Sequence, residues 1–167
     1  LIVMGKACAL LILTSILFAA SGCSGGDLDF CTLLTMDEVA RFDPDIVSSE
    51  MGIRSPETPT HYCIYKNKQN QEVFLLSMGT ATKNLPYDIL STFFPDTGGT
   101  DTVVLVDGVG TSAAALFSDD YPADRFRIMI ANGDKWSVTI RARGIPDEDS
   151  ARFQVLKDLA AKALTRF

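Results

Sequence analysis

Residues 125–141, RFRIMIANGDKWSVTIR, decide the fold of this chain. The dipeptide Asn132-Gly133 accepts the positive φ values that tight hairpin turns need. Apolar and polar residues alternate on both sides of it, as in strands with one face in a core and one face in water. We therefore predict two antiparallel strands, 125–131 and 136–141, whose core face holds Phe126, Ile128, Ile130, Trp136, Val138 and Ile140.

The rest of the chain carries the patterns of further helices and strands. Thr35 and Glu38 match a capping box, in which each side chain accepts a hydrogen bond from a backbone amide at the start of a helix. Pro86 suits the first turn of a second helix, and the acids after Pro146 suit the start of a third. We predict helices over 35–42, 85–94 and 146–167, strands over 61–66, 72–78, 103–106 and 113–118, and an irregular connection over 43–60.

This order of elements predicts the fold class. Adjacent strands joined by turns pair antiparallel, and a long amphipathic helix must cover the apolar face of the sheet. We expect an α+β domain over residues 30–167, with a mostly antiparallel sheet of about six strands packed against a C-terminal helix, and with two short helices.

An apolar leader precedes this domain. Residues 7–20 carry no charge and follow Lys6. As a helix they would span about 21 Å, less than the roughly 30 Å of a bilayer core, so they suit a secretory signal better than a membrane span. A buried core helix is the alternative. Met4 makes a more natural start than Leu1, and the sequence leaves the true start codon open.

The leader ends in a motif with its own chemistry. Ala20-Ser21-Gly22-Cys23 resembles the bacterial lipobox, although Ala20 stands where such sites usually have Leu. The resemblance implies that residues 1–22 are a lipoprotein signal peptide and that Cys23 receives a diacylglycerol. Residues 23–29 would then be a lipidated tether to the cell membrane, with the domain facing outside the cytoplasm. The sequence does not distinguish an anchor in the inner membrane from one in the outer membrane.

The cysteine count supports this interpretation. The chain has Cys8, Cys23, Cys31 and Cys63. Cys8 leaves with the leader, so acylation of Cys23 leaves one pair, whereas ordinary cleavage leaves an odd thiol in an oxidising compartment. We predict a Cys31–Cys63 disulfide that closes a loop between the first helix and the first strand. Two separate buried thiols are the alternative.

Three stretches carry a family resemblance: CTLLTMDEV (31–39), CIY (63–65) and VDGVGTSA (106–113). With the lipid cysteine, they resemble a family of cell-envelope lipoproteins of unassigned function, best represented in actinobacteria. The resemblance implies a PsbP-like α/β sandwich with the two cysteines bridged. It brings no catalytic residue to this chain.

The sequence carries few residues that are arranged for catalysis. His61 is the only histidine and no Gly-x-Ser-x-Gly motif is present, so we expect a surface histidine and not a catalytic or metal-binding one. With the cysteines lipidated or bridged, no thiol is left as a nucleophile. The acidic loop of Asp119, Asp120 and Asp124 lacks the spacing of a calcium loop, and we expect it to be solvated. We expect no cofactor.

Charge and the last hairpin suggest what the domain does. Twenty-one acidic residues against fifteen basic ones give a net charge of −6, which argues against nucleic acid as a partner. Arg127, Arg141 and Arg143 are expected to share the outer face of the hairpin with Thr139, where they would either receive an anionic ligand or partner or form the ordinary solvated face of a sheet. We therefore expect a non-enzymatic binding or interaction module for an unknown envelope protein or ligand. The alternatives are a small envelope hydrolase that uses the carboxylates of 119–124, and a structural or chaperone-like subunit of an envelope complex.

Overall fold

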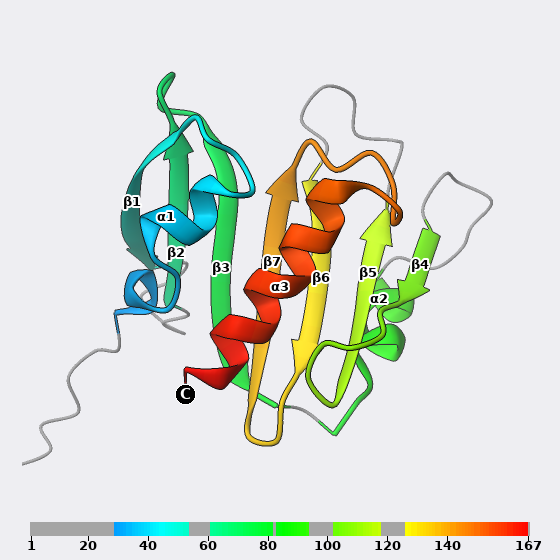
Figure 1. The fold of residues 1–167 in the computed structure, drawn as a ribbon. Coiled ribbons are helices and arrows are strands. Elements are labelled where there is room, and N and C mark those ends of the chain that lie inside the picture. The colour runs from blue at the N-terminus through cyan, green and yellow to red at the C-terminus, as the bar shows by residue number, and fades with distance from the viewer. Residues whose placement is uncertain (1–28, 54–60, 82, 94–101, 118–125, 167) are drawn as a thin grey trace, which may run out of the picture.

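One antiparallel sheet organises the computed structural model, which describes residues 29–53, 61–81, 83–93, 102–117 and 126–166 (Figure 1). The strand order in the sheet is β1-β2-β3-β7-β6-β5-β4. The strands are β1 (Ile46–Ile53), β2 (His61–Asn67), β3 (Glu72–Thr80), β4 (Thr102–Leu105), β5 (Ser112–Phe117), β6 (Phe126–Asn132) and β7 (Trp136–Arg143). The helices are the 3-10 turn η1 (Phe30–Thr32) and the α-helices α1 (Met36–Ala40), α2 (Pro86–Phe93) and α3 (Ala151–Thr165). The expected α+β class is confirmed.

The predicted hairpin is present, but its turn is built differently from our expectation. Strands β6 and β7 pair antiparallel from Phe126–Arg143 to Asn132–Ser137, and the Gly133 amide donates to the Trp136 carbonyl at 2.7 Å. Neither Asn132 nor Gly133 has a positive φ. Asn132 ends the strand instead of forming the turn, so the loop is longer than a two-residue turn and needs no left-handed residue.

Strand β1 lies in the region that we expected to be an irregular connection. It is an edge strand that pairs antiparallel with β2, from Ile46–Asn67 to Ile53–His61. Ser48, Ser49 and Gly52 are poor strand formers, and most of the strand is exposed. Pairing with β2, a tertiary contact, therefore makes this segment a strand, which local pattern did not predict.

The C-terminal helix starts later than predicted. Ser150 is the N-cap of α3, and its hydroxyl accepts a hydrogen bond from the Phe153 amide at 3.2 Å. The acids at 147–149 precede the helix and form a turn, in which the Ser150 amide donates to the Asp147 carbonyl. The prediction from acidic residues at a helix start was therefore wrong by one turn. The capping box of Thr35 and Glu38 at α1 is confirmed.

Helices cover both sides of the sheet. Figure 1 shows α1 and α3 on one side, which we call the inner face, and α2 on the other, the outer face. The main core lies under α3, whose buried residues are Phe153, Leu156, Leu159, Ala160 and Ala163. A smaller core lies under α2, where Leu90 packs with Ala114 and Leu116.

The core face predicted for β6 was wrong. Arg127 pairs with Ala142 and Met129 pairs with Ile140, so these β6 residues point to the inner face with the buried residues of β7. Ile128 and Ile130 instead pack against the smaller core beneath α2. Because β6 is apolar on both faces, alternation alone could not decide which face meets α3.

The predicted disulfide is confirmed and holds the N-terminal segment on the sheet. Cys31 in η1 bonds to Cys63 in β2, with their Cα atoms 5.0 Å apart. Beside it, the buried Tyr65 hydroxyl donates to the Leu34 carbonyl at 3.1 Å. Burial raises the pKa of Tyr65, so the phenol stays protonated and keeps this hydrogen bond.

We predict that the double substitution Cys31→Ser and Cys63→Ala lowers the free energy of unfolding by about 3 kcal/mol, because the closed loop no longer restricts the unfolded chain. Denaturant unfolding measures the change. A reductant should lower the stability of the native chain by a similar amount and leave the double variant unaffected. Equal stabilities of the two proteins would contradict the prediction.

Candidate ligand-binding face

Thr139, Arg141 and Arg143 share the outer face as predicted. They alternate along β7 with Val138, Ile140 and Ala142, which are buried on the inner face. All three outer side chains are half-buried. This part of the prediction matches the structure because β7 has a clean alternation of apolar and polar residues.

Arg127 does not belong to this group, which corrects the prediction. It lies on the inner face and is 1% exposed. Its Nε donates to the Ile145 carbonyl at 3.0 Å, and its guanidinium lies 5.3 Å from the centre of the Phe117 ring. Arg127 therefore holds the segment that leads into α3, which is a structural role.

An open hollow of about 240 Å³ lies on the outer face, across β2, β3 and β7. Two rows of paired residues line it. Ser77 of β3 pairs with Tyr62 on one side and Thr139 on the other, and Leu75 pairs with Ile64 and Arg141. Directly opposite residues of antiparallel strands point to the same face, so each row presents three side chains together. Glu72 completes the lining.

A glycine on the edge strand makes room for the aromatic ring of this hollow. A Cβ atom on Gly52, which pairs with Tyr62, would lie 2.5 Å from Cε2 of that ring. The Tyr62 ring therefore occupies the space above Gly52 that any other residue would fill. Gly79 on the same sheet has room for a Cβ, whose nearest neighbour would be Ser137 Oγ at 3.7 Å.

The chemistry of the lining suits binding. The first row offers three hydroxyl groups, the second two aliphatic side chains and a guanidinium, and Glu72 is the only carboxylate among the lining residues. The lining holds no histidine or cysteine that would act as a base or nucleophile. Mixed apolar and polar groups of this kind fix the orientation of a ligand.

Other predicted features fall outside the described residues. Cys23 and the loop of Asp119, Asp120 and Asp124 are among them, and of His61 only the position at the start of β2 is described. Within the described ranges, no group of three or more His, Cys, Asp or Glu side chains is placed to hold a metal ion. No helix in those same ranges has the length and apolar character to cross a membrane.

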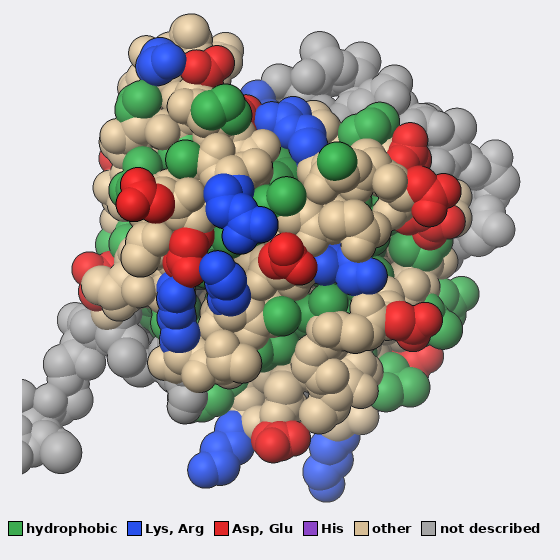
Figure 2. Space-filling view, viewed as in Figure 1, with side chains coloured by type: hydrophobic (Ala, Val, Ile, Leu, Met, Phe, Trp, Pro, Cys, Tyr) green, Lys and Arg blue, Asp and Glu red, His purple; other side chains and the backbone are tan. Residues whose placement is uncertain are grey.

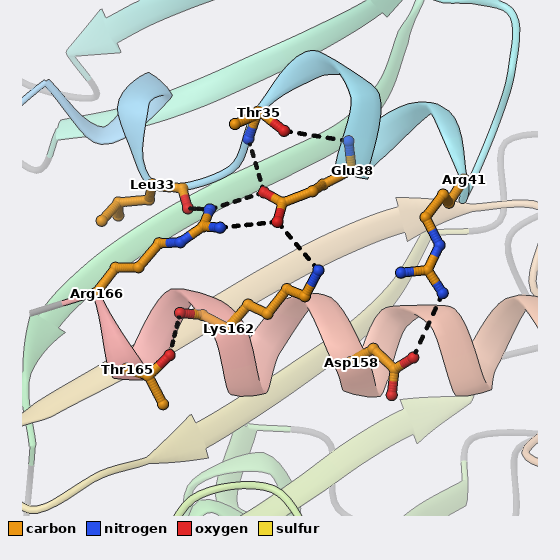
Figure 3. A network of polar contacts seen from close by, with 8 residues as sticks. All are labelled: Leu33, Thr35, Glu38, Arg41, Asp158, Lys162, Thr165 and Arg166. Atoms are coloured by element: carbon orange, nitrogen blue, oxygen red, sulfur yellow. Dashed lines mark hydrogen bonds and ion pairs between the residues drawn. The ribbon is translucent and has the colours of Figure 1, made fainter.

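A charged cluster that sequence reasoning missed joins α1 to the end of α3 (Figure 3). Glu38 accepts hydrogen bonds from both terminal nitrogens of Arg166 at 2.7 Å and from Lys162 Nζ at 3.0 Å, besides the Thr35 amide. Arg166 also donates to the Leu33 carbonyl. The Arg166 guanidinium, the Thr35 amide and the Lys162 ammonium lower the pKa of Glu38.

This cluster is structural. The oxygens of Glu38 are occupied by groups of the chain itself, so a ligand would have to displace a bidentate arginine. Figure 2 shows the same inner side of the molecule, where basic and acidic side chains lie side by side over α1 and α3. Such a mixed surface has no strong attraction for a charged partner.

Comparisons with known proteins give no relative from which a function could be inferred. No protein-family model, no curated protein and no solved structure matches the chain.

We predict that Glu38→Gln lowers the free energy of unfolding by about 1 kcal/mol at neutral pH, because two partly exposed cations lose their carboxylate. The lowered pKa keeps Glu38 charged in the folded state, so its contribution is complete above the ordinary pKa of about 4.3 and is lost as the pH falls below it. Unfolding curves at several pH values measure this, and the two proteins should converge in acid.

Asp158→Asn is the matched control. Asp158 lies 3.8 Å from Arg41, and both side chains are more than half exposed. Exposed pairs of this kind contribute little, so the control should unfold like the native chain at every pH. A Glu38→Gln deficit that persists unchanged in acid would show that the carboxylate charge is not its cause.

Proposed function

We propose that this chain is a lipid-anchored extracytoplasmic lipoprotein whose domain is a non-enzymatic binding or interaction module of the cell envelope. The observation that carries the binding role is the open hollow lined by Tyr62, Ser77, Thr139, Leu75 and Arg141, which combines hydroxyl groups, an aliphatic side chain and a guanidinium. Its partner is an envelope protein or a small ligand, and nucleic acid is excluded from the proposal by the acidic net charge.

Support for the location comes from the N-terminal motif and from the disulfide. Ala20 to Cys23 resembles a lipobox behind an apolar leader. The Cys31–Cys63 bond is compatible with an oxidising compartment, where disulfides form and persist. The resemblance to actinobacterial envelope lipoproteins agrees with the same location.

The anchor is tested by labelling cells with a fatty-acid analogue. Cys23→Ala should abolish the label, because no thiol remains to receive the diacylglycerol, and should release the domain or leave it unprocessed. Cys8→Ala is the matched control, since Cys8 lies within the leader and should leave labelling unchanged. Undiminished labelling of the Cys23 variant would overturn the proposed anchor.

The binding face is tested with a photo-reactive amino acid in intact cells. At Leu75, in the middle of the hollow, we expect a crosslinked product because a bound partner covers that position. At Asp158, an exposed position on α3 and on the inner side, we expect none. Equal products from the two positions, or none from Leu75, would contradict binding at the hollow.

A further inference from the structure

Four large apolar side chains are exposed around α2. Phe93 and Leu105 are 74% and 72% exposed, and Leu85 and Tyr87 are 55% and 40% exposed. We call Leu85, Phe93 and Leu105 the α2 patch, and leave out Tyr87 because a residue two positions from Leu85 lies on the other flank of the helix. Isolated exposed apolar residues are ordinary, whereas a group of them on one surface marks a contact with another molecule.

The fold brings these residues together. Leu85 and Phe93 lie one turn before and one turn after Ile89, so they extend along one side of the helix. Leu105 of β4 pairs with Ala114, which packs under α2 with Leu90, and so Leu105 points to the outer face beside the helix. The buried side of α2 holds Pro86 and Leu90, so the exposed stripe is additional to the contacts that hold the helix.

The chemistry of the patch points to an apolar occupant and not to a charged one. Asp88 is the only charged residue of α2. The chain as a whole is acidic, with a net charge of −6. Because the patch residues themselves are uncharged, they can approach an anionic lipid surface without the repulsion that the acidic residues of this domain would meet.

We propose that the α2 patch lies against the lipid bilayer and orients the domain on it. This inference rests on the proposed lipid anchor at Cys23. Only five residues separate Cys23 from Asp29, where the described domain begins, so the Cα atoms of Cys23 and Asp29 lie at most about 21 Å apart. The tether therefore holds the domain beside the bilayer at a high effective concentration, so a modest apolar contact suffices.

The side chains of the patch suit the interfacial region. Leu85, Phe93 and Leu105 supply the apolar area that such a contact buries. The hollow over β2, β3 and β7 lies on the same face of the sheet as α2. Docking through α2 turns that hollow towards the membrane surface.

The test uses the full lipidated chain, reconstituted in phosphatidylcholine vesicles whose acyl chains carry bromine, a quencher of tryptophan fluorescence. Phe93→Trp places a probe in the patch. Val47→Trp is the matched control, because Val47 is 53% exposed on β1 at the other edge of the sheet. The native Trp136 contributes equally to both and is subtracted with the unsubstituted chain.

We expect bromine to lower the added fluorescence of Phe93→Trp at least about twofold and that of Val47→Trp hardly at all, because only the patch reaches the acyl chains. Equal quenching of the two probes, while the protein still floats with the vesicles, would overturn this inference and leave the anchor intact. Loss of flotation would overturn the anchor itself and, with it, the inference.

A photo-reactive residue at position 93 in intact cells distinguishes the molecules that could cover the α2 patch: lipid, another protein or a second copy of this chain. A crosslink to lipid supports the inference. A crosslink to a protein, or to a second copy of this chain, assigns the patch to that partner and overturns docking on the bilayer.

Discussion

The register of β6 against β7 is the constraint on which the rest of this structure depends. It sets Arg127 opposite Ala142 and Ile128 opposite Arg141, so neighbouring residues of one strand go to opposite sides of the sheet. A shift by one residue would turn every side chain of β6 over. The main core beneath α3 receives Met129 and Ala131 through this pairing, and the smaller core beneath α2 receives Ile128 and Ile130.

Burial of Arg127 shows how the register overrides side-chain type. A guanidinium is costly to bury unless its donors find acceptors. Here its Nε reaches the Ile145 carbonyl, and the ring of Phe117 lies beside its charge. An arginine can therefore be buried on the inner face, because its hydrogen bond to the Ile145 carbonyl fixes the segment before α3. Sequence reasoning placed it outside because arginine is usually exposed.

Local pattern predicted what local interactions determine. The capping box at Thr35, the amphipathic α3 and the alternation of β7 were recognised because the decisive residues lie within a few positions of one another. Pairings between distant segments were not recognised from the sequence. Strand β1 depends on β2, and Glu38 meets Arg166 across 128 positions. The candidate face was half predicted: Thr139 and Arg141 came from β7 alone, whereas Tyr62, Ser77 and Leu75 needed the pairing of three strands.

The short length of α2 explains why hollow and patch occur on the same face. Eight residues make a helix of about 12 Å, which covers β4, β5 and β6 but leaves β2, β3 and β7 open. The inner face carries the longer α3 together with α1, and its core is closed. The outer face therefore keeps both a concave polar surface and a protruding apolar helix. With the lipid anchor that we propose at Cys23, the exposed side of α2 would orient the hollow, because one sheet connects the two.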